Sequence, residues 1–220
     1  MTFSIVARDK KTGDFGAAVA SRMIRVGGLV PHARAGVGAM ATQNARTEPF
    51  RFRYGQEGMK LLEQGLASKE VLARLLDADD KSEQMQLAVI DRSGQVATHT
   101  GRGMPAWSGH MVGDNFSVQG NLLAGEKVVR RMRDAYESSE GSGLAERLLR
   151  ALEGGDSVGG DQRGKQAAGL IVVREFGGPN SLSDKLVDLR VDDHVEPFKE
   201  LRRLLNLHNQ TNISRGWSTS

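Results

Sequence analysis

The chain has 220 residues, of which 39% are hydrophobic and 26% charged, as is typical of a globular protein. It has no cysteine, which excludes disulfides, thiolate metal sites and a cysteine nucleophile, and no apolar run approaches membrane-spanning length. Lys and Arg outnumber Asp and Glu by only 30 to 27, basic residues are scattered and aromatics make up 5%, which argues against nucleic-acid binding. The N-terminal residues do not resemble a signal peptide, so we expect a cytoplasmic location.

The chain begins with a predicted β-hairpin. Residues 2–8 form its first strand and residues 15–21 its second, joined by a turn in which Gly13 supplies the positive φ. The small residues of the second strand indicate close packing beneath another layer. We expect a loop over residues 22–32 and then a glycine-rich strand over residues 35–43.

Two helices and two further strands follow. Hydrophobic spacing predicts helices over residues 54–64 and 69–77. The pattern then returns to strands over residues 85–90 and 95–100, with the turn Asp91-Arg92-Ser93-Gly94 between them.

The remaining elements again group strands with helices. In chain order they are a strand at 116–121, helices at 126–137 and 144–152, strands at 168–174 and 186–191, and a helix at 198–207. A loop that holds Trp107 and His110 precedes them, and Gly154 and Gly155 are expected to end the second helix. Residues 209–220 are polar and are predicted to form a flexible tail.

This order of elements predicts the fold class. Strands and helices each occur in runs, which argues for an α+β protein and against a doubly wound parallel sheet. Two antiparallel sheets packed face to face, with helix pairs on both outer faces, would bury every apolar stripe. We therefore predict a four-layer αββα sandwich, with residues 1–208 as a single domain. Such a sandwich is expected to form a homo-oligomer, although no sequence feature fixes the number of subunits.

The first strand carries the candidate chemistry. If Met1 is removed, Thr2 presents an α-amine and a hydroxyl on one residue, and an N-terminal amine is a recognised activator of Thr. The usual pKa of that amine, about 7.7–8.0, is close to neutral pH, where a general base is most useful. Position alone is weak support, because any chain can have Thr at position 2.

Motifs spread along the chain strengthen this hypothesis. They are TFSIVARD, GAAVASR, AGVGAMATQ, FSVQGN, GGDQRGKQ and DLRVDDH. Over nearly all of residues 2–207 the chain resembles the domain-of-unknown-function family 1028. This resemblance implies membership of the N-terminal-nucleophile (Ntn) hydrolase superfamily, an αββα fold and a catalytic role for Thr2.

The chain also resembles proteasome β-type chains more distantly, but it differs from them at two positions that matter for catalysis. In those chains, too, a Thr opens a hairpin whose partner strand ends in Ser-Arg, here Ser21-Arg22. The acid that precedes Ser-Arg there is replaced by Ala20, and no lysine stands in residues 22–43, where the catalytic lysine of that family falls. The electrostatic support for the nucleophile must therefore differ.

Residues near Thr2 along the predicted hairpin are candidates for substrate binding. Ser4 lies on the same strand face as Thr2, so it either lines the site or packs against a neighbouring strand. Ser21 and Arg22 end the partner strand. Arg22 either orients a carboxylate and lowers the pKa of the amine, or is a surface residue at a strand end.

Amide groups elsewhere are candidates for binding the substrate carbonyl and its oxyanion. Gln43 and Asn44 close the third predicted strand, and Gly120-Asn121 offers a backbone N–H and a side-chain donor. We assign Gln43 and Asn121 to the catalytic group and Asn44 and Gly120 to substrate binding. The alternative for Asn121 is a turn residue.

Two charged residues and the absence of ligand motifs complete the set. Asp161 and Arg163 lie in a Gly-Gly loop and are predicted to form an ion pair near the amine of Thr2, unless they belong to a simple turn. The compact Asp192-Asp193-His194 and the spacing of the other histidines do not define a metal site. No Walker-type loop, dinucleotide fingerprint or nucleophile elbow is present. We expect neither metal nor cofactor.

Two functional hypotheses remain. The first is an Ntn-type amidohydrolase that cleaves a small amide or isopeptide-like substrate through an ester on Thr2. The second is a binding or assembly protein that keeps the fold without chemistry, which the missing acid and lysine favour. In both cases we expect no membrane partner.

Overall fold

The computed structural model describes residues 2–45, 53–105 and 107–215, which form two sheets and five helices. The first sheet has six antiparallel strands in the order β10-β9-β2-β1-β8-β7. Its strands, in chain order, are β1 (Thr2–Arg8), β2 (Phe15–Ser21), β7 (Gly109–Gly113), β8 (Phe116–Asn121), β9 (Ala167–Val173) and β10 (Lys185–Val191). The N-terminal strand β1 lies between β2 and β8, so it is an interior strand of this sheet.

The second sheet has four antiparallel strands, with the order β3-β4-β5-β6. They are β3 (Pro31–Arg34), β4 (Gly38–Asn44), β5 (Met85–Asp91) and β6 (Val96–Thr100). The helices are α1 (Tyr54–Glu63), α2 (Ser68–Asp77), α3 (Lys127–Glu137), α4 (Leu144–Asp156) and α5 (Pro197–Arg215). Short 3₁₀ turns occupy Val26–Gly28, Ser82–Gln84 and Pro179–Ser181.

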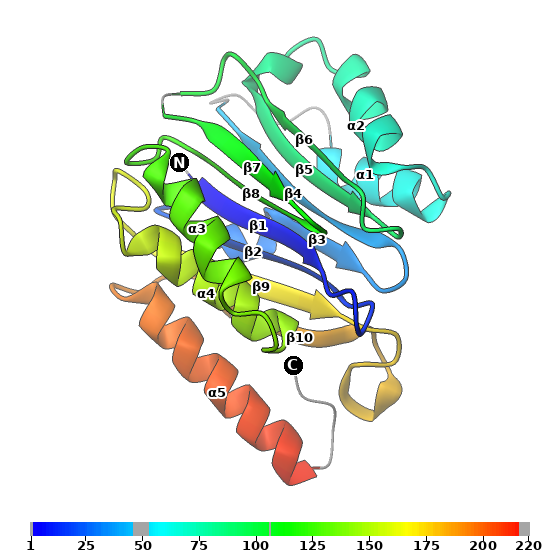
Figure 1. Ribbon diagram of the computed structural model, residues 1–220, viewed down its shortest axis with the longest axis vertical. Helices are drawn as coiled ribbons and strands as arrows, with labels where there is room; N and C mark the ends of the chain where they lie inside the picture. Colours follow the sequence, from blue (N-terminus) through cyan, green and yellow to red (C-terminus); the bar gives the residue numbers. More distant parts are fainter. Residues whose placement is uncertain (1, 46–52, 106, 216–220) are drawn as a thin grey trace.

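The layers are those of the predicted αββα sandwich (Figure 1). Helices α3 and α4 cover the six-stranded sheet, and helices α1 and α2 cover the four-stranded sheet. The two sheets face each other, with β1 against β4 and β5, and a small apolar core between them. The α+β class and the four-layer arrangement are therefore confirmed.

Alternation along β1 divides its side chains between two layers. Phe3 and Ile5 point toward the helices, where they join the core formed with α3 and α4. Val6 joins the core between the two sheets, and Ser4 bonds to Gln43 of the opposite sheet. Thr2 has the same parity as Ser4 and Val6, so the pleat directs it to the inter-sheet side.

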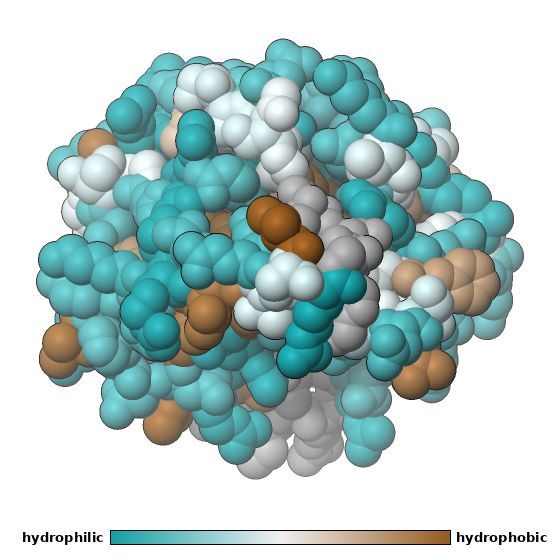
Figure 2. Space-filling model, turned by 90° about the horizontal axis from the view of Figure 1, so that it is seen from below, coloured by the Kyte–Doolittle hydropathy of each residue, from teal (hydrophilic) through white to brown (hydrophobic). Residues whose placement is uncertain are grey.

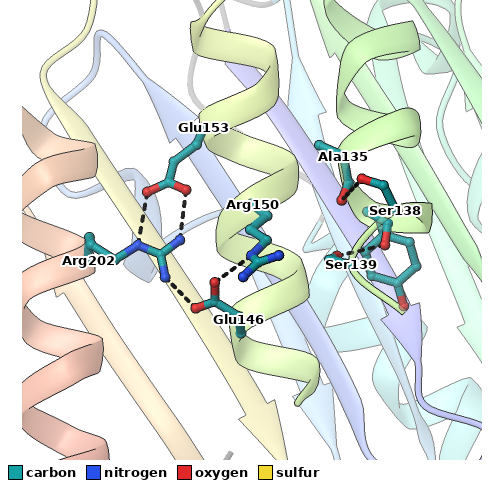
Figure 3. Close-up of polar contacts among 8 residues, drawn as sticks. Ala135, Ser138, Ser139, Glu146, Arg150, Glu153 and Arg202 are labelled. Carbon is teal, nitrogen blue, oxygen red and sulfur yellow. Dashed lines mark hydrogen bonds and ion pairs between the residues drawn. The ribbon is translucent and has the colours of Figure 1, made fainter. Parts of the chain in front are cut away.

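Helix α5 is held against α4 by a charged bridge (Figure 3). The guanidinium of Arg202 donates to both carboxylate oxygens of Glu153, at 3.1 and 2.7 Å, and also to Glu146. Arg150 of α4 donates to Glu146 at 2.6 Å, so the Glu146 carboxylate is shared between Arg150 and Arg202 of α5. Bidentate pairs of this kind fix orientation as well as charge.

Two edge strands were missed by the sequence analysis. Strand β3 begins inside the loop predicted for residues 22–32, and β7 lies in the loop predicted around His110. Each is short and lies at the edge of its sheet, with exposed and half-buried residues. A short strand without a buried face has no clear alternation of polar and apolar residues, so periodicity cannot find it.

Two helix ends were also predicted wrongly. Helix α4 continues through Gly154 and Gly155, because these glycines let it approach α3: a Cβ at Gly154 would lie 2.8 Å from that of Ala135. Helix α5 extends to Arg215, so residues 209–215 of the predicted tail are helical, and Asn212 is buried. Residues 216–220 of that tail lie outside the described residues.

The surface is largely hydrophilic on the side shown in Figure 2, where hydrophobic residues are scattered among polar ones. None of the helices in the described ranges has the length and apolar character that crossing a membrane requires. The predicted homo-oligomer and the single-domain boundary stay predictions.

Candidate active site

A cavity of about 710 Å³ opens at the N-terminal end of β1. Its walls come from the ends of β1, β2 and β4, the turn after β2 and the start of α1. Six of the predicted site residues line it, and they are Thr2, Ser21, Arg22, Gln43, Asn44 and Arg163. The sandwich thus brings together residues from three distant segments of the sequence.

Pairing on both sides of β1 fixes Thr2 at this cavity. Its Cα lies opposite Ser21 of β2 and opposite Asn121 of β8, so the three residues stand abreast across the sheet. The Thr2 Oγ1 donates to Ser21 Oγ at 3.1 Å, and Thr2 is only 7% exposed. The hydroxyl is therefore held in a defined orientation beside the cavity.

A buried network of amides and hydroxyls lies beneath Thr2, between the sheets. Ser4 Oγ accepts from Gln43 Nε2 and from Gln119 Nε2, both at 2.6 Å. Asn121 Nδ2 donates to Gln43 Oε1 at 2.7 Å and to Gln86 Oε1 at 3.0 Å. Every member is at most 3% exposed, so these hydrogen bonds replace those that water would make.

The network shows where the structure places three of the candidate residues. Ser4 is fully buried and does not line the cavity, so it supports the site from below. Asn121 is likewise outside the lining, and an amide NH₂ has two hydrogens, both used here by Gln43 and Gln86. Gly120 is outside it too, and its carbonyl accepts from Gln86 at 2.9 Å. In this structure Asn121 and Gly120 therefore lie outside the cavity lining and are bonded to Gln43 and Gln86.

Gln86 is the centre of the network and was not identified from the sequence. Its Nε2 lies 3.0 Å from Thr100 Oγ1, 3.1 Å from Gly109 O and 2.9 Å from Gly120 O. It therefore ties β5 to β6, β7 and β8. A glutamine inside the apolar run of MQLAVI was the available signal.

A second group of polar contacts holds the arginines at the cavity. Asp161 Oδ2 accepts from the backbone N–H of Arg22 and from Arg163 Nη2, each at 3.1 Å. Arg22 Nη1 donates in return to Arg163 O at 2.7 Å. The predicted ion pair between Asp161 and Arg163 is present, and Asp161 itself lies behind the lining. The Gly-Gly loop thus serves to place Arg22 and Arg163.

Several lining residues were not among the predicted candidates. Apolar side chains come from Met23, Leu29 and Val30, and polar ones from His32, Arg53 and Tyr54. Burial lowers the pKa of His32, although a hydrogen bond with the backbone of Leu29 opposes this effect. His32 is therefore a neutral imidazole at neutral pH.

The charged side chains in the described lining of the cavity are all basic. Within the described ranges it contains Arg22, Arg53 and Arg163 but no aspartate or glutamate. The same part of the chain brings no three His, Asp or Glu side chains together as a metal site requires. The chemistry of the cavity is that of hydroxyls, amides and guanidinium groups.

Fold and site together define an αββα protein in which a cavity-facing threonine opens an interior strand of the larger sheet. The chain belongs to the family of unknown function DUF1028, whose model matches residues 2–201. It is similar to protein SPO2555 from Silicibacter pomeroyi, a DUF1028 crystal structure, with 28% identity and a TM-score of 0.82. That match covers 94% of this chain and 88% of the other.

More distant similarities add no functional argument. The Anbu (ancestral beta-subunit) from Yersinia bercovieri is 15% identical with a TM-score of 0.39, and the match covers 97% of each chain. An Anbu (Gly-1) mutant from Hyphomicrobium sp. strain MC1 is 11% identical with a TM-score of 0.43, again over 97% of each chain. Comparison with curated proteins gives no match.

Proposed function

We propose that the protein is an N-terminal-nucleophile amidohydrolase that cleaves the C–N bond of a small amide through an ester on Thr2. One observation supports the proposal: Thr2, whose hydroxyl is oriented by Ser21, lines a cavity large enough for a small-molecule substrate. Removal of Met1 would place a free amine on the same residue, where it can act as the base.

The reaction follows from these groups. Thr2 Oγ attacks the amide carbonyl while its proton passes to the amine, directly or through water. The C–N bond then breaks, the leaving nitrogen takes that proton, and water hydrolyses the ester to release the acid and restore the hydroxyl. The arginine charges beside Thr2 disfavour a protonated amine, which is a role that a lysine can also fill.

Gln43 is the better of the two predicted donors for the oxyanion. Gln43 lines the cavity and its Nε2 donates one hydrogen to Ser4, which leaves the second hydrogen for a ligand, whereas both hydrogens of Asn121 are used inside the network. Removal of an oxyanion donor typically lowers the rate about 10²–10³-fold. We therefore assign Gln43 to the oxyanion and Asn121 to holding Gln43 in place, with Asn44 as a further substrate contact.

The first test combines intact mass with a variant. Protein produced without an N-terminal tag is expected to lack one methionine, and a panel of small amides is then assayed for release of amine. Thr2→Ala should lose at least about 10³-fold in kcat because the nucleophile is gone. Thr2→Ser, which keeps a hydroxyl and the amine, is the matched control and should retain part of the activity.

Two results would contradict the proposal: quantitative retention of Met1, or full activity in Thr2→Ala. Thermal unfolding of each variant separates lost chemistry from lost folding. If Met1 is retained and the cavity still binds small molecules, the second candidate, a binding protein without catalysis, takes its place. That candidate is favoured by Ala20 and by the lack of lysine and carboxylate in the described lining of the cavity.

A further inference from the structure

Arg163 and Arg22, two arginines that line the cavity, differ in their partners within the protein. The guanidinium of Arg163 is paired with Asp161, whose side chain is 2% exposed. No carboxylate in the described ranges pairs with Arg22, and its side chain makes one hydrogen bond, to the carbonyl of Arg163. A guanidinium has five N–H donors, so most of those on Arg22 remain available to a ligand.

Arg22 is also held in a fixed direction. Its backbone N–H is bound by Asp161 and its Nη1 by Arg163 O, so both ends of the residue are tied to the same loop. It directly follows Ser21, which stands opposite Thr2. A pre-oriented guanidinium at this place matches the geometry of a carboxylate, which it can bind through two parallel hydrogen bonds.

The wall next to Arg22 is apolar. Met23 and Leu29 line the cavity and are 41% and 46% exposed, and Val30 also lines it but is buried. Covering such side chains with an apolar group releases free energy in proportion to the area removed from water. The cavity therefore combines a carboxylate-binding group, an apolar wall and the candidate nucleophile.

We infer that the substrate is an amide that carries both a carboxylate and an apolar side chain, as an N-acylated apolar amino acid does. Arg22 binds the carboxylate, Met23 and Leu29 contact the side chain, and the amide carbonyl lies at Thr2 Oγ. Hydrolysis yields a carboxylic acid and a free amino acid with water as the only co-reactant. This inference rests on the proposed function and specifies its substrate.

The test measures binding separately from turnover. Protein with Thr2→Ala, which cannot form the ester, is titrated with N-acetyl-L-leucine and with its neutral isostere N-acetyl-L-leucinamide, and binding is followed by calorimetry. The carboxylate is expected to bind at least about tenfold more tightly, because only it can use the guanidinium fork. Arg22→Gln in the same background should abolish this preference, and Arg22→Lys should restore part of it.

Arg130→Gln provides the matched control. Arg130 is an exposed arginine of α3, paired with Glu126 on the outer face of the sandwich, and its replacement changes the net charge equally. It should leave the preference intact. Equal binding of the two probes, a preference that survives Arg22→Gln, or no binding of either at about 10 mM would overturn the inference.

A third probe tests the apolar wall. N-Acetylglycine keeps the carboxylate but lacks the side chain, and it should bind about five- to tenfold more weakly than N-acetyl-L-leucine. Equal affinities would overturn that half of the inference. Hydrolysis of N-acetyl-L-leucine by the unsubstituted protein is measured independently, so binding without hydrolysis refutes the proposed catalysis and leaves the ligand class supported.

Discussion

The two ends of strand β1 differ in how they use charge. A cavity of about 710 Å³ lies at the Thr2 end and one of about 590 Å³ at the Arg8 end. Within the described ranges, the first is lined by arginines without a carboxylate. The second is lined by basic and acidic residues in equal number, which are Arg8, Lys10, Lys11, Arg147 and Arg174 against Asp9, Asp14, Asp114, Glu137 and Glu140.

Most of the charged side chains at the Arg8 end already interact with other groups of the protein. Asp14 accepts two hydrogen bonds from Arg174, at 2.7 and 2.6 Å, and Lys10 pairs with Asp114. The guanidinium of Arg147 lies 4.0 Å from the ring centroid of Tyr136, a cation–π geometry. The two cavities are similar in volume and in arginine content. They differ in the balance of charge, because only the cavity at the Arg8 end has carboxylates in its described lining.

The largest effect is expected from breaking the buried network at the Thr2 end. Gln86→Leu keeps the side-chain volume but removes the hydrogen bonds that the carbonyls of Gly109 and Gly120 accept from Gln86, and it takes away the acceptor of one Asn121 hydrogen. Each such buried group costs about 1–3 kcal/mol, so we expect a loss of about 3 kcal/mol in the free energy of unfolding. Urea denaturation measures it.

Gln95→Leu is the control for that change, because Gln95 is exposed in the turn after β5. It should alter the free energy of unfolding by no more than about 0.5 kcal/mol. A loss below about 1 kcal/mol in Gln86→Leu would show that the network does not contribute to stability as inferred.

A smaller effect is expected at the Arg8 end. Asp14→Ala leaves Arg174 without its carboxylate, and because the Arg174 side chain is 31% exposed, the cost should fall between that of surface and buried pairs, at about 2 kcal/mol. The free energy of unfolding should fall while binding of N-acetyl-L-leucine is unchanged. A loss of that binding would show that the two ends are not independent.

Asp114→Ala makes the same charge change in the same cavity. The side chain of Asp114 is 75% exposed, and its partner Lys10 is 58% exposed. Exposed ion pairs contribute little to stability because water screens them, so this control should be nearly neutral. Equal losses in the two variants would contradict the structural role given to Asp14.

Much of the fold could be predicted from local patterns. The hairpin of residues 2–8 and 15–21 is adjacent in sequence, and its register follows from a short turn, so Thr2 and Ser21 could be placed together. The helices of the two outer layers have clear apolar faces, whereas edge strands β3 and β7 have none. Patterns of burial are visible in a sequence only where an element buries one face.

The candidate site was harder to predict from the sequence, because the contacts that define it join residues far apart in the chain. Arg22, Arg53 and Arg163 come from three separate segments, and nothing local shows that they share a cavity. Both hydrogens of the Asn121 amide are donated to Gln43 and Gln86, which lie in the opposite sheet. Sequence motifs could indicate such residues, but only the packing of the two sheets determines which of them line the cavity.

The smallest expected effect is a pH dependence specific to the Thr2 end. His32 is half-buried, and its ring lies against the first turn of α1, where a Cβ on Gly55 would be 2.1 Å from its Nε2. Burial lowers the pKa of His32 from its ordinary value of 6.5, with partial opposition from a hydrogen bond to the backbone of Leu29. The charged groups of the two cavities that His32 lines are Arg22, Arg34, Arg53, Lys60, Glu63 and Arg163.

The sign of the effect follows from linkage. As pH falls below about 6.5, the unfolded chain binds a proton at His32 and the native protein does not, so the free energy of unfolding decreases. The decrease ends once pH is below the lowered pKa of the native state. Burial also lowers the pKa values of His110 and His208, so the total dependence contains more than one contribution.

His32→Gln isolates the contribution at the Thr2 end. Melting temperatures between about pH 8 and pH 5 should fall less steeply in this variant than in the unsubstituted protein. His208→Gln, on α5, should remove only its own share and keep the part due to His32. Identical slopes with and without His32 would show that its imidazole is protonated equally in both states. Since the Arg8 cavity has no histidine in its described lining, Asp14→Ala should leave the His32 contribution unchanged.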